Sequence, residues 1–222
     1  MCNVPHSEPA VGASHARLAE SAGKMDKMES VRIGVVSDIH CNATGLRAAL
    51  AAMGAIDQLI CAGDSIHEYR FSNEVVAILR DHAAHTILGN HEEGFYGPHG
   101  MRARDQEWID TDHLDWLATR PHRIELDVAG RRIVIVHSTP WSPRGQYVYP
   151  HSPELARFGD PAAGGIEADY LIYGHTHAPV ARRIGSTLVV NPGSAGQARD
   201  GHGLSCAVLE LTSGEAHIVE YS

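Results

Sequence analysis

Side chains that commonly bind metal ions recur at five places in the sequence, each directly after an apolar run. Taken alone, each place has an ordinary explanation, such as a capping aspartate, a turn or a buried histidine. Five such places in one chain are hard to explain as coincidences, so we interpret them as one site built from distant segments. The five stretches are Asp38-Ile39-His40, Gly63-Asp64, Gly89-Asn90-His91-Glu92, His137 and Gly174-His175-Thr176-His177.

The cluster offers two carboxylates, one amide oxygen and at least four imidazoles, and it requires no thiolate. Mixed oxygen and nitrogen ligands of this kind suit Mn, Fe, Zn, Co or Ni better than Ca or Mg. These ligands are too many for one tetrahedral zinc ion, and they fit two ions that share a bridging carboxylate. Two-metal sites clamp the attacking and leaving oxygens of an in-line displacement, so the residues favour hydrolytic chemistry.

The first half of the chain alternates predicted strands and helices. Apolar runs at 31–40, 57–64 and 85–92 predict buried strands, the last of which ends in a polar turn. Apolar residues at helical spacing predict helices over 46–53 and 73–82. Alternation of this kind indicates an α/β arrangement, in which sites lie beyond the carboxyl ends of the strands.

The second half predicts hairpins instead. Short turn sequences at 129–130, 185–186 and 212–214 each join two strand-like segments. A short helix is expected over 111–119 and a further buried strand over 169–177. The predicted fold class is therefore α/β, with a mixed sheet or two packed sheets and helices on the outside.

Composition narrows the classes of function. The 222 residues carry 18 Lys and Arg against 27 Asp and Glu, a formal net charge of −9. So acidic a chain argues against binding of long nucleic acid, but not against one nucleotide or small phosphoester. No apolar stretch approaches the roughly 20 residues that span a bilayer, so we expect no membrane association. The four cysteines are far apart and form no CxxC pair, which favours a reducing cytoplasm.

The chain is predicted to form one domain after a short tail. Residues 1–30 have almost no branched aliphatic side chains, and we expect a flexible N-terminal tail there. Met25 or Met28 are alternative starts for the protein. Residues 31–222 show no internal repeat and no low-complexity linker, which indicates a single folded unit. The sequence leaves the oligomeric state open.

The order of the motifs, D-x-H, G-D, G-N-H-[DE], H and G-H-x-H, resembles the calcineurin-like metallophosphoesterase superfamily. The match extends over residues 31–211, and the segments at 136–150 and 191–201 are similar to the small stand-alone prokaryotic branch. The resemblance implies a four-layer α/β/β/α sandwich of two mixed β-sheets flanked by helices. It also implies a binuclear metal-dependent phosphoesterase in which a metal-bridging hydroxide attacks phosphorus in line.

The resemblance also implies a role for each motif residue. Asp64 bridges the two metals. His91 is not a ligand but faces the phosphoryl group, where it stabilises charge and protonates the leaving alkoxide. One metal is held by Asp38, His40 and His177. The other metal is held by Asn90, His137 and His175.

Three features near the motifs depart from the family pattern, one of which is Ser138 after His137, where the family usually has glycine. Cys41 follows His40 where the family usually has glycine, so a positive φ there would strain the backbone. A tolerated small residue is favoured over the alternatives, a stray metal ligand or an oxidation-sensitive thiol. The segment after Asp64 lacks the VDRG sequence of Ser/Thr protein phosphatases, and this makes phosphoproteins less favoured as substrates. Glu92, however, is common in that branch. His67 is interpreted as a surface histidine, with substrate contact as the alternative.

A long proline-rich stretch at 138–165 is a candidate for substrate recognition. Trp141, Tyr147 and Tyr149 either stack on a base or pack the loop onto the sheet, and the sequence leaves these alternatives even. Arg144 is predicted to pair with phosphate.

Two more segments are candidates for the rim of the pocket. Residues 92–108, with Arg102 and Arg104, form a candidate lid. Arg199 and Asp200 are predicted to close the pocket from a third side.

The expected function is hydrolysis of a small phosphodiester or nucleotide, with two divalent transition-metal ions as cofactors. Manganese is the first choice, followed by Fe, Zn, Co or Ni. The alternatives are a phosphomonoesterase, a dinucleoside polyphosphate hydrolase, or a catalytically silent metal-binding scaffold of the same fold. The complete set of ligand residues favours an active enzyme over the scaffold.

Overall fold

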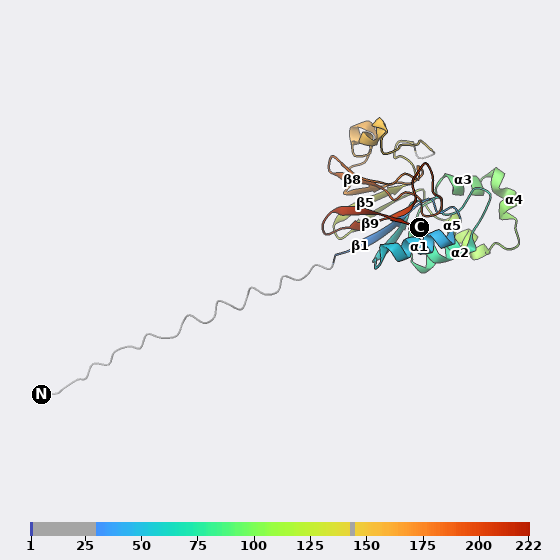
Figure 1. Ribbon diagram of the computed structural model, residues 1–222, viewed down its shortest axis with the longest axis horizontal. Helices are drawn as coiled ribbons and strands as arrows, with labels where there is room; N and C mark the ends of the chain where they lie inside the picture. Colours follow the sequence, from blue (N-terminus) through green and yellow to red (C-terminus); the bar gives the residue numbers. More distant parts are fainter. Residues whose placement is uncertain (2–29, 143–144) are drawn as a thin grey trace.

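The computed structural model describes residues 1, 30–142 and 145–222. The predicted tail at 1–30 therefore lies almost entirely outside the described residues, and so does Arg144. In the described part, ten strands form two five-stranded sheets. Figure 1 shows the sheets as two layers, with α1 and α2 beneath the first.

The first sheet takes its three parallel strands from the N-terminal half and its two antiparallel strands from the C-terminus. Strand β1 lies at its centre, between β2 and β9. This arrangement confirms the predicted strand–helix alternation of the first half. The order is β10 (Glu215–Tyr221), β9 (Leu204–Glu210), β1 (Arg32–Val36), β2 (Gln58–Cys61) and β3 (His85–Thr86).

The second sheet contains two of the three predicted hairpins. Strands β4 and β5 pair antiparallel across residues 129–130, and β7 and β8 pair across 185–186. Strand β6 lies between β5 and β8 and is parallel to both. The order is β4 (Arg123–Val128), β5 (Arg131–Val136), β6 (Tyr170–Ile172), β8 (Thr187–Asn191) and β7 (Val180–Ile184).

Alternation along the strands divides the core into layers. Val35 of β1 belongs to the apolar cluster between the two sheets, where it meets Ile135 of β5, whereas the next residue, Val36, packs with Leu46 of α1. Successive side chains of a strand point to opposite faces, so β1 is apolar on both. Helices α1 (Ala43–Met53) and α2 (Asn73–Asp81) cover the outer face of the first sheet.

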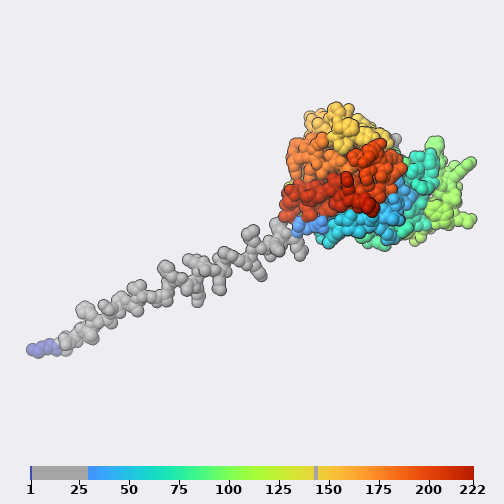
Figure 2. Space-filling model, viewed as in Figure 1, coloured from blue at the N-terminus to red at the C-terminus, as the bar shows by residue number. Residues whose placement is uncertain are grey.

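The outer face of the second sheet is covered by the segment at 145–166. This segment contains two short 3-10 helices, η2 (Pro153–Arg157) and η3 (Pro161–Ala163). Phe158 and Leu155 from it pack on the second sheet. In the space-filling view this yellow segment lies over the orange strands (Figure 2). The four-layer α/β/β/α sandwich is therefore confirmed.

One local prediction is wrong. The third strand, β3, has only two residues, and the expected polar turn at its end is instead the start of α3 (Asn90–Tyr96). The candidate lid at 92–108 is largely helical, since η1 (Pro98–Gly100) and α4 (Met101–Arg104) follow α3. The predicted helix over 111–119 is α5 (Thr111–Ala118).

None of the helices in the described ranges is both long and apolar enough to cross a lipid bilayer.

Leu46 and Arg47 are neighbours in α1 that test this packing. Leu46 is fully buried against the first sheet, whereas Arg47 is exposed and pairs with Glu74. We expect Leu46→Ala to lower the free energy of unfolding by about 2–5 kcal/mol, because it leaves a cavity in the core. Arg47→Ala should cost less than about 1 kcal/mol. Urea denaturation of both variants checks this, and equal losses would contradict the placement of α1.

Candidate metal centre

The predicted ligands all lie just beyond the C-terminal ends of strands, at one edge of the sandwich. Asp38 and His40 follow β1, Asp64 follows β2, and the first turn of α3 carries Asn90. His137 directly follows β5. The loop after β6 contributes His175 and His177.

Most of these residues have an unusual backbone conformation. A left-handed conformation costs a non-glycine residue on the order of 1–3 kcal/mol and persists only where the surroundings hold it. Hydrogen bonds between the loops do so here: the Asp38 amide donates to the Gly63 carbonyl at 3.1 Å, and the His40 amide donates to the Asp64 carbonyl at 3.0 Å. The residues with positive φ are Asp38 (53°), His40 (48°), Asp64 (52°), His175 (68°) and His177 (55°).

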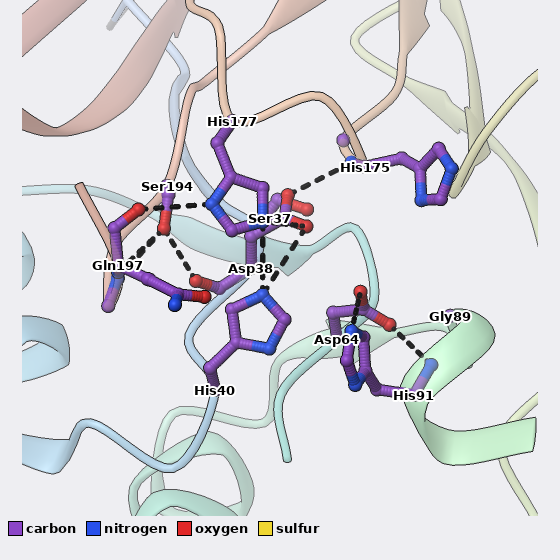
Figure 3. Close-up of polar contacts among 12 residues, drawn as sticks. Ser37, Asp38, His40, Asp64, Gly89, His91, His175, His177, Ser194 and Gln197 are labelled. Carbon is purple, nitrogen blue, oxygen red and sulfur yellow. Dashed lines mark hydrogen bonds and ion pairs between the residues drawn. The ribbon is translucent and has the colours of Figure 1, made fainter. Parts of the chain in front are cut away.

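The first group of potential ligands consists of Asp38, His40 and His177, whose ligand atoms all lie within 4.8 Å of one another. His177 donates from Nδ1 to the Gln197 carbonyl at 3.0 Å, which leaves a lone pair on its Nε2. That Nε2 lies 3.1 Å from His40 Nε2 and 3.3 Å from Asp38 Oδ1. Figure 3 shows the two imidazoles pointing toward each other beside the Asp38 carboxylate.

The second group consists of Asp64, His137 and His175, with ligand atoms again within 4.8 Å. His137 donates from Nδ1 to the Ala62 carbonyl at 2.8 Å, so its Nε2 faces the group. That atom lies 3.2 Å from Asp64 Oδ2 and 3.1 Å from Asn90 Oδ1. The structure therefore brings all seven predicted ligands together.

Asp64 lies between the two groups. Its ligand atom is within 4.8 Å of that of His40 from the first group, as well as those of His137 and His175 from the second. Its Oδ1 accepts a hydrogen bond from the His91 amide at 2.9 Å, as Figure 3 shows. A carboxylate in this position can serve two cations at once.

The charges of the cluster fit cations. Burial raises the pKa of Asp38 and of Asp64, but this effect is outweighed by the neighbouring His177 and His137 respectively, and both pKa values end below the usual range. Both carboxyl groups are therefore ionised, although they are at most 1% exposed. In the part of the chain that the structure describes, they form ion pairs with histidines only. A buried pair of like charges requires cations nearby.

Two of the histidines present lone pairs in this environment. Burial lowers the pKa values of His40 and His175 to about 4, so both are neutral at pH 7. Burial also opposes protonation of His137, yet the adjacent Asp64 carboxylate raises its pKa to about 10, so a cation bound there would displace the proton from His137 Nε2. Within the described residues, Asp38 Oδ1, His40 Nδ1 and His175 Nε2 have no hydrogen-bond partner although they are buried. This donor set fits divalent transition-metal ions.

Glu92 is a supporting residue whose role the sequence did not reveal. Its buried carboxylate accepts hydrogen bonds from the amides of Asp64, Ile66 and Gly89 and from the Ser65 hydroxyl, at 2.7–3.0 Å. Burial, with Asp64 nearby, raises the pKa of Glu92. Glu92 therefore ties the loop after β2 to the start of α3. The signal was a glutamate three residues after a glycine, which is typical of a helix start.

His91 and His67 lie beside the metal-binding residues. His91 Nδ1 accepts from the Glu68 amide at 3.3 Å, so the neutral ring carries its proton on Nε2, which lies 3.8 Å from Asp64 Oδ2. The His67 ring lies 4.8 Å from that of His91 and 6.1 Å from that of His40. A polar cleft of about 370 Å³ contains both His40 and His67. His67 is thus at the site, which supports the alternative of substrate contact.

The predicted substrate-binding aromatics have different surroundings. Trp141 packs against Phe158, lies under the guanidinium of Arg157 at 4.1 Å, and donates from its indole to the Gln146 side chain. These contacts agree with the alternative that Trp141 packs the loop onto the sheet. The ring of Tyr147 is half-exposed and stacks on His175, with ring centroids 4.0 Å apart.

The predicted arginines are the remaining candidates. Arg199 is exposed and donates to the Gln197 side chain at 3.0 Å. Arg104 donates to the Gly97 carbonyl at 2.9 Å, so it closes the end of α3, whereas Arg102 is exposed. Arg144 lies outside the described residues. Substrate contacts by these arginines stay predictions.

Cys41 has the strained conformation that its position suggested, with φ of 66°. Its thiol lies 3.2 Å from the Arg70 carbonyl, and burial raises its pKa to about 11. The thiol is thus protonated at pH 7, and Cys41 belongs to none of the ligand groups found in the described ranges. These findings favour the interpretation as a tolerated residue.

Comparison with known proteins identifies the family. Residues 31–214 match the model of the calcineurin-like phosphoesterase superfamily domain, so the chain belongs to this superfamily. A curated relative, an uncharacterized protein of Methanocaldococcus jannaschii, is 28% identical over 198 residues, which is 76% of this chain and 78% of that protein. Membership supports metal-dependent hydrolysis of phosphoesters as the general class of activity.

Solved structures show the same fold. A metallophosphoesterase of Sphaerobacter thermophilus is 25% identical, with a TM-score of 0.67, and the match covers 87% of this chain and 89% of that one. The hypothetical protein PH1004 of Pyrococcus horikoshii is 18% identical, with a TM-score of 0.71 and coverage of 86% and 89%.

Gly174 offers a test of the geometry around the first group. A Cβ at this position would lie 2.0 Å from Ser37 Oγ and 2.7 Å from Asp38 Oδ2. We expect Gly174→Ala to displace the Asp38 carboxylate and to weaken Mn²⁺ binding about 10–100-fold, as measured by calorimetric titration of chelator-treated protein. Gly203→Ala is the matched control, because a Cβ there meets nothing within 4 Å. Unchanged affinity in Gly174→Ala would contradict this geometry.

Cys41→Gly tests the strain at the first motif. Glycine adopts a positive φ without a steric penalty, so we expect a gain of about 1 kcal/mol, or roughly 2–4 °C in Tm. Cys41→Ala keeps the Cβ and should show no gain. Thermal unfolding of the two variants decides between strain and loss of the thiol, and a Tm of Cys41→Gly no higher than that of Cys41→Ala would count against strain.

Proposed function

We propose that the protein is a binuclear metal-dependent phosphoesterase that hydrolyses a small phosphodiester or nucleotide. The observation that carries this proposal is the position of Asp64 between two groups of potential ligands. Asp38, His40 and His177 would hold one cation, and Asn90, His137 and His175 the other. Manganese is the first choice of metal, because the ligands combine oxygen with imidazole nitrogen.

Two divalent cations in this position would polarise the phosphoryl oxygens and lower the pKa of water. The chain supplies the remaining functions. His137 and His177 are fixed in orientation by the carbonyls of Ala62 and Gln197, so their Nε2 atoms are directed at the cation sites before the substrate arrives. Preorganisation of this kind strengthens electrostatic stabilisation of the transition state.

His91 is the proposed proton donor. Its Nε2 proton faces the space between the two groups, while Nδ1 is held by the Glu68 amide. During displacement, the oxygen of water bonds to phosphorus and the ester P–O bond breaks. The leaving oxygen takes the proton from His91 Nε2, which is regenerated by the proton released from water.

A small substrate fits the charge of the protein. The net charge of −9 disfavours a long polyanion, whereas cations in the site can offset the charge of one phosphoester. A phosphomonoester or a dinucleoside polyphosphate is the second candidate for the substrate. The polar cleft that contains His67 and Arg70 next to His40 is the observation that favours it.

Variants of Asp64 and His91 test the mechanism. Asp64→Ala should lose both bound metal and activity, because it removes the residue common to the two groups. His91→Ala should keep its metal while kcat falls about 10²–10⁴-fold. Metal content by elemental analysis and turnover of bis-p-nitrophenyl phosphate with Mn²⁺ measure these effects.

The control is His217→Ala, which removes an exposed histidine of β10 and should change neither quantity. Full metal content with unchanged turnover in both site variants would refute the mechanism. Metal-loaded wild-type protein without turnover on a broad phosphoester panel would instead support the scaffold.

A further inference from the structure

A row of aromatic rings leads away from the metal centre. Tyr147 stacks on His175 with centroids 4.0 Å apart and planes 27° apart. Tyr149 follows at 6.1 Å and His151 at 5.7 Å, each pair with planes only 15° apart. We call His175, Tyr147, Tyr149 and His151 the aromatic row. Its first member is a proposed metal ligand.

The backbone of this segment is anchored between the two tyrosines. Val148 is 1% exposed, and its carbonyl accepts a hydrogen bond from the Tyr173 hydroxyl at 3.2 Å. The Tyr149 amide donates to the Ser152 hydroxyl at 2.9 Å. The buried Val148 thus anchors the backbone between the two tyrosines, whose ring planes are 15° apart.

The row ends at a cavity. Tyr149 and His151 line a space of about 700 Å³ together with Ala178 and Pro179, the residues that directly follow His177. The lining also includes the polar side chains of Ser152, Arg182, Asp200 and His202. A cavity of this size accommodates a drug-sized molecule, and its mixture of apolar and polar walls is typical of ligand sites.

Tyr147 is a large aromatic residue that stays half-exposed although one of its neighbours is buried. Its side chain belongs to the few large apolar ones that are exposed in the described part, at 51%. Its ring neighbours in the row are His175 and Tyr149, and about half of Tyr147 remains open to solvent. Aromatic side chains in such positions stack on the bases of nucleotides, and this interaction tolerates different bases.

We propose that the aromatic row recognises the nucleoside part of the substrate, with Tyr147 as the stacking platform next to the phosphoryl group. The polar side chains that line the cavity supply hydrogen bonds to the sugar or base. This proposal rests on the proposed function and narrows its substrate to phosphoesters of nucleosides. It assigns recognition to Tyr147 and Tyr149 rather than to Trp141.

Binding of AMP and ribose 5-phosphate to the metal-loaded full chain tests the proposal. The two ligands share the sugar and the phosphate and differ in the base, so the ratio of their Kd values isolates the base. Wild type should bind AMP more tightly by about 5- to 100-fold in calorimetry. Tyr147→Ala should lose most of this preference, whereas Tyr147→Phe should keep it.

His217→Ala is the control, because this exposed histidine belongs to β10, at the edge of the first sheet, rather than to the aromatic row or the candidate lid. It should leave both Kd values unchanged. Equal binding of AMP and ribose 5-phosphate by wild type would overturn the proposal. So would equal weakening of both ligands by Tyr147→Ala, and so would binding of phenyl phosphate as tight as that of AMP.

These outcomes are independent of the proposed function. Turnover of glycerophosphoethanolamine, a phosphodiester without an aromatic group, measures hydrolysis alone in the metal-loaded wild-type protein. A preference for AMP that depends on Tyr147 would support the aromatic row even if no phosphoester is hydrolysed. Metal-dependent turnover without that preference would support hydrolysis and overturn the row.

Discussion

The fold holds electron-rich atoms close together although they repel one another, and the site depends on a compensating positive charge. Two buried carboxylates and several imidazole lone pairs meet at one edge of the sandwich, and positive charge between them is the physical condition for their stability. Backbone strain adds to this cost, since five of the proposed ligands have positive φ. Apolar clusters lie between the two packed sheets and on the outer face of each sheet, and they supply the rigidity that holds the arrangement.

Supporting residues turn this cluster into an ordered site. Main-chain carbonyls of Ala62 and Gln197 hold Nδ1 of His137 and of His177, so neither ring has to turn when a cation binds. Glu92 performs the corresponding task for the main chain around Asp64 and Gly89. The sequence motifs thus identify the ligands, whereas the orientation of the ligands depends on these supporting partners.

Periodicity and motif order in the sequence were enough to predict most strands and the proposed metal ligands. Strands β1, β2, β5 and β6 are apolar runs, and the polar residues after them were recognised as ligands because strand ends gather at one edge. Helix α3 was missed because Gly89, Asn90 and His91 are typical of turns. Its start depends on Glu92 reaching amides of a loop distant in sequence, and local propensity carries no such information. The stacking of Tyr147 on His175 is likewise a long-range contact.

His175 belongs both to the proposed metal ligands and to the aromatic row. Its imidazole belongs to the second group of potential ligands, while the face of its ring stacks on Tyr147. A base stacked on Tyr147 would therefore lie one ring away from a metal ligand, so recognition and chemistry share a residue. Movement of Tyr147 would be transmitted to the imidazole, because the rings are in direct contact. Binding of the nucleoside and alignment of the phosphoryl group are then coupled through packing, with no moving lid required.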